Sequence, residues 1–187
     1  APGDITLHRP LGTQDLLLTF AGSEDTLTLT NYFTGYDRFQ IQFADSTLWS
    51  IADIAALVVH IDSTEDADEL IGTTHPDLIN SYAGNDEIYA AEGNDTVNAS
   101  TGNDTVYGGN GADTLNGFDG EQLLVGEAGN DSLVGGKGND TMNGGMGADT
   151  FVGGQGNDLI NGGGDADLVY GDTGNDTIYG GDVDDLI

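Results

Sequence analysis

Apolar residues recur along this chain with two different periods, and the change falls near Ile61. Before it, short runs such as residues 16–20 and 39–43 place apolar residues at every second position, with turn residues between the runs. Period two with intervening turns predicts an antiparallel β-meander. After it, single apolar residues recur at a longer, regular spacing. We therefore expect two parts, a meander in residues 1–62 and a repeat region in residues 63–187.

A short helix is expected at the end of the first part. Ser50 followed three residues later by Asp53 resembles a capping box, which predicts a helix over residues 51–59. This helix would lead from the meander into the repeats. We expect residues 1–62 as a whole to cap the repeat region, because a solenoid needs a polar-faced end over its first core layer.

The repeat region has a period of nine without a slip. One series in it carries aspartate at every position but one: Asp68, Asp77, Asp86, Asp95, Asp104, Asp113, Gln122, Asp131, Asp140, Asp149, Asp158, Asp167, Asp176 and Asp185. The series two residues later is apolar throughout: Leu70, Ile79, Ile88, Val97, Val106, Leu115, Leu124, Leu133, Met142, Phe151, Ile160, Val169, Ile178 and Ile187. The best units, residues 135–143 and 153–161, follow the pattern GGxGxDxUx with U apolar. We number each unit so that the aspartate stands at position 6 and the apolar residue at position 8.

This spacing predicts coils of eighteen residues, each with two short parallel strands and two loops. Within a strand of three residues, the middle side chain at position 8 points inward and its neighbours point outward, because successive side chains alternate. The position 8 residues then form a single thin core. The loops stack in two columns, with neighbours about 4.8 Å apart, the strand spacing. Column A holds Asp86, Asp104, Gln122, Asp140, Asp158 and Asp176, and column B holds Asp77, Asp95, Asp113, Asp131, Asp149, Asp167 and Asp185.

The charge of the chain indicates what lies between the stacked carboxylates. Three basic residues against 33 acidic ones give a net charge of -30, which excludes nucleic acids and anionic membranes as partners and favours a cation. Calcium accepts six to eight oxygen ligands, including backbone carbonyls, whereas magnesium demands a stricter octahedron. The chain has no cysteine, so disulfides and thiolate zinc sites are excluded. It also has no run of eighteen apolar residues, so no membrane-spanning helix is expected.

The units at residues 135–143 and 153–161 resemble the RTX, or repeat-in-toxin, family of exported bacterial proteins, whose calcium-binding nonapeptide has this pattern. The resemblance covers residues 63–187. In addition, residues 39–43 with Trp49 and residues 51–54 are similar to the haemolysin-type calcium-binding-related segment that accompanies such repeats. The expected fold is all-β: a right-handed parallel β-roll, capped by a small antiparallel meander with one short helix.

The resemblance also implies a ligand set for each calcium ion. The ion takes the aspartate and the carbonyls of positions 2 and 4 from one loop, with the aspartate and the carbonyls of positions 1 and 3 from the loop one coil on. One such site comprises Gly136, Gly138 and Asp140 with Gly153, Gln155 and Asp158; another comprises Gly145, Gly147 and Asp149 with Gly162, Gly164 and Asp167. The full set of expected calcium ligands is Asp77, Gly84, Asp86, Gly93, Asp95, Gly102, Asp104, Gly108, Asn110, Gly111, Asp113, Gly126, Ala128, Gly129, Asp131, Gly136, Gly138, Asp140, Gly144, Gly145, Met146, Gly147, Asp149, Gly153, Gly154, Gln155, Gly156, Asp158, Gly162, Gly163, Gly164, Asp167, Gly171, Thr173, Gly174, Asp176 and Asp185.

The number of calcium ions depends on how regular the columns are. The two columns allow at most about twelve sites, of which about eight are expected to be well formed. The two spaces beside Gln122 should be weak or empty, unless Asp119 or Glu121 replaces the missing carboxylate. The end units are degraded, because the glycine of position 4 is replaced in them by Asp66, His75, Asp165 and Val183.

These features predict a structural, calcium-dependent module of a larger protein. A flexible Gly/Asp-rich linker is excluded, because a linker would not keep an apolar residue at position 8 in all fourteen registers. Without calcium, the carboxylates of the two columns repel one another, so the repeats should fold only where calcium is plentiful, outside the cell. The resemblance implies type I secretion and a secreted or cell-surface bacterial protein. No catalytic residues are assigned, since no nucleophile motif or zinc spacing occurs. Two alternatives stay open: a glycan- or surface-binding module that uses outer threonine, asparagine and tyrosine faces, and an enzyme located in residues 1–62.

Overall fold

The computed structural model describes residues 5–8, 16–20, 26–29, 40–42, 48–50 and 59–187, and these residues form strands, turns and loops without a helix. Fourteen of the strands belong to the repeat region and the residues just before it. They are β6 (Val59–Asp62), β7 (Glu69–Ile71), β8 (Asp77–Asn80), β9 (Glu87–Tyr89), β10 (Thr96–Asn98), β11 (Thr105–Asn110), β12 (Thr114–Asp119), β13 (Leu123–Ala128), β14 (Ser132–Lys137), β15 (Thr141–Met146), β16 (Thr150–Gln155), β17 (Leu159–Gly164), β18 (Leu168–Thr173) and β19 (Thr177–Gly181).

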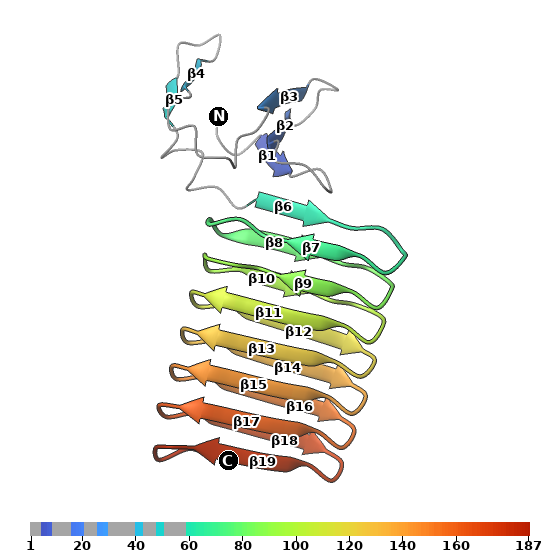
Figure 1. Cartoon of the computed structure of the whole chain (residues 1–187), viewed down its shortest axis with the longest axis vertical. Coiled ribbons are helices and arrows are strands. Elements are labelled where there is room, and N and C mark those ends of the chain that lie inside the picture. Colours follow the sequence, from blue (N-terminus) through green and yellow to red (C-terminus); the bar gives the residue numbers. More distant parts are fainter. Residues whose placement is uncertain (1–4, 9–15, 21–25, 30–39, 43–47, 51–58) are drawn as a thin grey trace.

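These strands wind into a parallel β-solenoid with two strands in each coil. Even-numbered strands from β6 to β18 pair in sequence order in one sheet, and odd-numbered strands from β7 to β19 pair in a second sheet of seven strands. Paired residues differ by eighteen, as in Val97 with Leu115. Figure 1 shows the coils stacked on one another, each carrying one strand of either sheet. The expected eighteen-residue coil and the parallel pairing are thereby confirmed.

The core is a single file of position 8 side chains, as expected. Every member from Leu70 to Val169 is at most 2% exposed, and Ile61, nine residues before Leu70, extends the file by one step. At the other end, Ile178 is only partly buried and Ile187 is 68% exposed. The thin core therefore depends on coil-to-coil contacts, because each apolar residue is covered by its neighbours in the stack.

The strands β11 to β18 are longer than the three residues that the period suggests. Each runs for six residues, because positions 1 to 3 of the next loop stay in register with the next coil. Gly109 pairs with Glu127 and Asn110 with Ala128 in this way. The pairing between coils thus reaches into the first half of each of these loops, even though the position 2 residue has a positive φ, such as 106° in Gly109.

The outward faces of the sheets carry ladders of identical side chains. The Nδ2 of Asn98 donates to Oδ1 of Asn80 at 2.9 Å, and the Nδ2 of Asn116 donates to Oδ1 of Asn98 at 3.0 Å. On the other sheet, the rings of Tyr89 and Tyr107 stack with centroids 5.0 Å apart. Because these side chains bind one another, they stabilise neighbouring coils. The structure therefore gives no support to the glycan- or surface-binding alternative.

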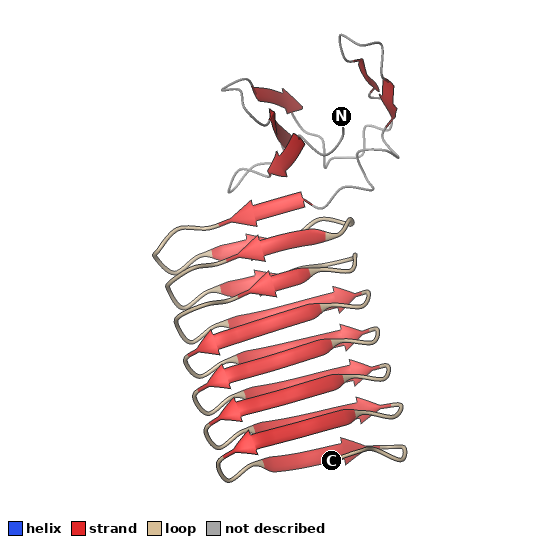
Figure 2. Cartoon of the chain, turned by 180° about the vertical axis from the view of Figure 1, so that it is seen from behind, coloured by secondary structure: helices blue, strands red, loops and turns tan. Residues whose placement is uncertain are grey.

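Short strands precede the roll, and three of them pair antiparallel in the order of a meander. β1 (Ile5–His8), β2 (Leu16–Phe20) and β3 (Thr26–Leu29) pair antiparallel in order, and β4 (Gln40–Gln42) pairs with β5 (Leu48–Ser50). β1 also pairs with β6 in parallel, so the meander continues the even-numbered sheet into ten strands (Figure 2). Most of the helix expected over residues 51–59 lies outside the described residues, and Val59 begins β6. The capping role and the division at residue 62 stay predictions.

Candidate metal centre

The position 6 aspartates line the inside of the two loop columns. From Asp77 to Asp167 each is at most 3% exposed, as is Gln122, whereas Asp68, Asp176 and Asp185 are half-buried. Charged side chains are almost never buried to this degree unless they are paired or bind a metal. The burial of a whole series of carboxylates therefore requires a partner.

One carboxylate oxygen of each aspartate is bound by backbone. In both columns, Oδ1 accepts a hydrogen bond from the backbone N–H of the position 6 residue one coil earlier. The N–H of Asp95 donates to Oδ1 of Asp113 at 2.8 Å, and the N–H of Asp140 donates to Oδ1 of Asp158 at 2.9 Å. This ladder turns each carboxylate back toward the preceding coil. We call the space between two such residues a gap and name it by both, as in the 140/158 gap.

The second carboxylate oxygen has no partner. Among the described residues, Oδ2 is buried without a hydrogen bond in Asp86, Asp95, Asp104, Asp113, Asp131, Asp140, Asp149, Asp158 and Asp167. Buried polar atoms in native proteins nearly always have a partner, and an unpaired oxygen costs about 1–3 kcal/mol. Nine equivalent orphan oxygens in register therefore indicate a repeated ligand site. Asp77 is different, because its Oδ2 accepts the N–H of Thr73 at 2.6 Å.

Glycine at positions 1 and 4 leaves room for this arrangement. A Cβ on Gly108, at position 1, would stand 2.7 Å from Oδ2 of Asp113. A Cβ on Gly102, at position 4, would collide with the carbonyl oxygen of Gly84 one coil earlier. The position 4 carbonyl thus lies against the following coil, and the position 1 carbonyl of Gly126 lies against Gly108 in the preceding coil.

Each gap therefore gathers oxygens from two loops. It receives the orphan Oδ2 of the later aspartate and backbone carbonyls from both sides. Throughout the described residues, no three acidic or histidine side chains come together, so the backbone must supply most of the ligands. Carboxylate and carbonyl oxygens in this mixture suit a hard cation with a high coordination number, which is calcium rather than zinc or magnesium.

The electrostatics of the columns favour a positive charge. Burial raises the pKa of Asp95 and Asp149 to about 7, and repulsion from neighbouring carboxylates adds to the rise. Burial likewise raises the pKa of Asp104, Asp131 and Asp140 to about 6. In each case the backbone hydrogen bond from the preceding coil opposes the shift. Burial thus disfavours the ionised form of these carboxylates, and a bound cation would favour it.

The raised pKa values predict a dependence on pH. Because they exceed the value of about 3.9 for an unfolded aspartate, the calcium-free roll is most stable in acid and loses that stability as pH rises through 6 and 7. Protons also compete with calcium for the same oxygens. We expect calcium affinity, measured by calorimetry, to be at least about tenfold lower near pH 5 than near pH 7.5. An affinity independent of pH would contradict this.

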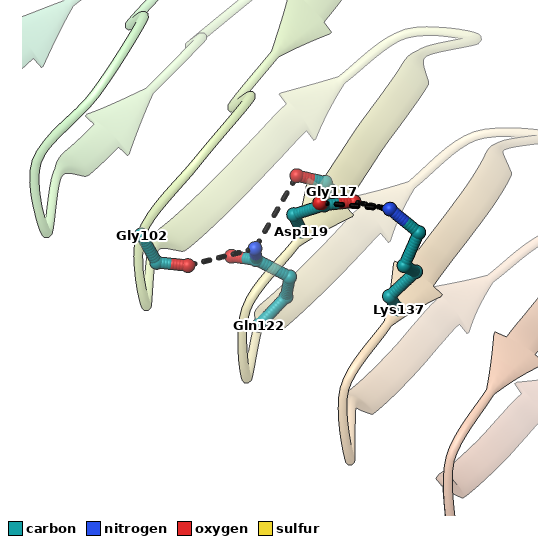
Figure 3. A network of polar contacts seen from close by, with 5 residues as sticks. All are labelled: Gly102, Gly117, Asp119, Gln122 and Lys137. Atoms are coloured by element: carbon teal, nitrogen blue, oxygen red, sulfur yellow. Dashed lines mark hydrogen bonds and ion pairs between the residues drawn. The ribbon is translucent and has the colours of Figure 1, made fainter.

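Gln122 interrupts column A. Its backbone N–H donates to Oδ1 of Asp140 at 2.8 Å, and its Oε1 accepts the N–H of Asp104 at 2.9 Å, so the ladder continues. Its Nε2 donates to the carbonyl oxygens of Gly102 at 3.0 Å and Gly117 at 3.3 Å, as Figure 3 shows. No atom of this amide is left unpaired.

Neither acidic neighbour of Gln122 takes over the missing carboxylate. Asp119 forms an ion pair with Lys137, whose Nζ lies 2.8 Å from Oδ1, and both side chains are exposed (Figure 3). The Oε1 of Glu121 accepts a hydrogen bond from Nδ2 of Asn139 at 3.3 Å. Both carboxylates therefore lie at the rim of the loops, where they link two coils.

The repeat pattern did not lead us to expect a structural role for the asparagine at position 5. Asparagines at this position accept a hydrogen bond on Oδ1 from the position 5 N–H one coil on. Asn94 binds Ala112 at 3.0 Å in this way, and Asn130 binds Ala148 at 3.0 Å. The signal was available, because asparagine precedes most of the aspartates. This second ladder stabilises the turn next to each gap.

The fold and its gaps define a class of protein, a parallel β-solenoid whose stacked loops suit a hard cation. Comparison with protein families agrees. The RTX calcium-binding nonapeptide repeat matches in four copies, at residues 62–97, 89–120, 116–151 and 152–187. The chain belongs to this family, and it is a calcium-binding structural module. The haemolysin-type calcium binding protein related domain matches residues 15–53, so both resemblances are confirmed. A search of curated proteins found no match.

Proposed function

We propose that the roll folds when calcium enters its gaps and serves as a folding and export module of a larger secreted bacterial protein. The observation that carries this proposal is the set of nine buried, unpaired Oδ2 atoms in two regular columns. They fit the ligand pattern of the RTX family, to which the chain belongs. We infer about nine well-formed sites, close to the number expected from the repeat alone.

The residues of one gap have distinct tasks. In the 140/158 gap, Asp158 supplies a carboxylate oxygen while its other oxygen orders the backbone of Asp140. Carbonyls of Gly136 and Gly138 from one loop, and of Gly153 from the next, complete the oxygen set. When bound, calcium supplies the positive charge that lets the two columns of carboxylates stay ionised. Glycine keeps the backbone close enough for its carbonyls to serve as ligands.

Calcium concentration then decides where the chain folds. Extracellular calcium modules bind with dissociation constants of about 10⁻⁴–10⁻³ M, far above cytosolic calcium. The chain would remain unfolded inside the cell and fold outside, which suits export through a type I secretion system and opposes return. Within the described residues, none of the structure forms a helix that could cross the hydrocarbon core of a membrane. The other domains of the exported protein would be the passengers, and no catalytic role is assigned to this chain.

The proposal is tested by counting bound calcium. We expect calorimetry to show several calcium ions bound per chain and no comparable binding of magnesium. Asp149→Asn changes the 131/149 gap, into which the Asp149 side chain turns, and should lower the number of bound ions by one. Asp182→Asn, at an exposed loop position, is the matched control and should leave it unchanged. Absence of calcium binding by the wild-type chain would reject the proposed function.

A further inference from the structure

The amide of Gln122 spans a gap in the same way as an ion would. Its Nε2 lies within hydrogen-bond distance of two carbonyl oxygens, of Gly102 at position 4 of the earlier loop and of Gly117 at position 1 of its own loop. In the other registers, the orphan Oδ2 lies beside position 1 of its own loop, where a Cβ on Gly108 would stand 2.7 Å from Oδ2 of Asp113. Nε2 replaces that orphan oxygen, and it brings two N–H donors to oxygens that elsewhere await a cation.

We propose that the Gln122 amide takes the place of calcium in the 104/122 gap, while the 122/140 gap keeps a calcium site. This inference rests on the proposed function. It differs from the expectation drawn from the repeat, in which both gaps beside Gln122 are equally weakened. The difference arises because a position 6 side chain turns toward the preceding coil only.

In the 104/122 gap, both polar atoms of the Gln122 side chain are already hydrogen-bonded, so neither is available to an ion. Oε1 is bound to the N–H of Asp104, and both hydrogens of Nε2 point to carbonyls. Calcium in this gap would have to displace the amide from those carbonyls and would find one carboxylate fewer. The Gln122 side chain is 2% exposed, so it has no room to swing into solvent.

The 122/140 gap is built differently. Asp140 turns into it, with Oδ1 bound to the N–H of Gln122 at 2.8 Å and Oδ2 buried and unpaired. The carbonyl oxygen of Gly135 lies against Gly117, and that of Gly120 lies against Gly138, so both border this space as the corresponding carbonyls do in other gaps. At the rim, the Lys137–Asp119 ion pair links the same two coils. The 122/140 gap therefore keeps a carboxylate and carbonyl oxygens as ligands for calcium, and the Lys137–Asp119 ion pair lies beside it.

Column A is thereby divided into two calcium-binding stacks joined by a link that contains no metal. The loops that end at Asp104 and Gln122 are held together by side-chain and backbone hydrogen bonds alone. This contact is therefore made without an ion of its own, although the roll as a whole still needs calcium in the other gaps.

The test is Gln122→Asp, which restores the carboxylate of the other registers. Equilibrium dialysis with radioactive calcium at saturation should show one more bound ion per chain than in the wild type. The matched control is Asp131→Gln, which places the same amide in a central gap of column B and should bind one ion fewer. An unchanged or lower count in Gln122→Asp would overturn the inference.

A second variant guards against misfolding of the first. Gln122→Leu removes the amide without adding a carboxylate, so it should lower the melting temperature in saturating calcium and leave the number of bound ions unchanged. Loss of an ion in this variant would show that the 104/122 gap holds calcium in the wild type and would overturn the inference. If the wild-type chain bound no calcium at all, the proposed function itself would fail, which is a distinguishable result.

Discussion

Removing calcium with EGTA is expected to unfold the roll, with loss of its far-UV β signal. Nine buried carboxylate oxygens are unpaired without an ion, and each costs about 1–3 kcal/mol. A typical domain is stable by only about 5–15 kcal/mol. The net charge of -30 adds repulsion between the acidic side chains. Near neutral pH, the free energy of unfolding without calcium should therefore fall below zero. The repeats should then unfold and become sensitive to proteases.

The controls for this experiment are simple. Adding back calcium should restore the β signal cooperatively, whereas the same concentration of magnesium should not, because the gaps offer many carbonyl oxygens and no fixed octahedron. Circular dichroism measures the folded fraction, and limited proteolysis reports on the same transition independently. A β signal that survives EGTA unchanged at neutral pH would show that the roll does not require calcium to fold.

Replacing Gly156 with alanine is expected to cause a large loss of stability. This glycine stands at position 4 with φ 140°, and a Cβ there would collide with the carbonyl oxygen of Gly138 one coil earlier. Neither residue can move away, because both belong to turns held by the coil-to-coil ladder. We expect a destabilisation of about 3 kcal/mol and loss of calcium from the 140/158 gap.

The matched control is Gln155→Ala. Gln155 is the neighbouring loop residue and is exposed, and its backbone carbonyl, which accepts the N–H of Gly138 at 2.8 Å, remains after the substitution. The free energy of unfolding of the Gln155→Ala variant in saturating calcium should differ from that of the wild type by less than about 0.5 kcal/mol. Chemical unfolding of both variants, with calcium counted by dialysis, gives the comparison. Equal midpoints for Gly156→Ala and the wild type would contradict the steric argument.

The sequence was sufficient to predict the coil. A residue such as Leu115, apolar at position 8, can be buried only if the chain turns every nine residues, so the period itself implies the eighteen-residue register and the single file of core residues. The burial of Asp113 two residues earlier follows from the same register. At the last register, Ile187 is 68% exposed, which the period by itself does not indicate.

Other features could not be predicted, because they depend on contacts between coils. The six-residue strands arise from backbone pairing of loop positions such as Gly109 with Glu127, which no local pattern reveals. The position 5 ladder of Asn94 to Ala112 requires the spacing and direction of two loops to be known. Asp119 was a candidate substitute ligand by its place in the sequence, yet its carboxylate is paired with Lys137 at the rim.

The sequence by itself determined the parallel coil, its core, the two columns of aspartates and the family to which the chain belongs, because all of these follow from one period of nine. Only the tertiary structure decided which of two neighbouring gaps a given side chain enters. The backbone N–H of the preceding coil binds one oxygen of each position 6 side chain and turns it in that direction. For this reason Gln122 closes the 104/122 gap and leaves Asp140 free to face the next one.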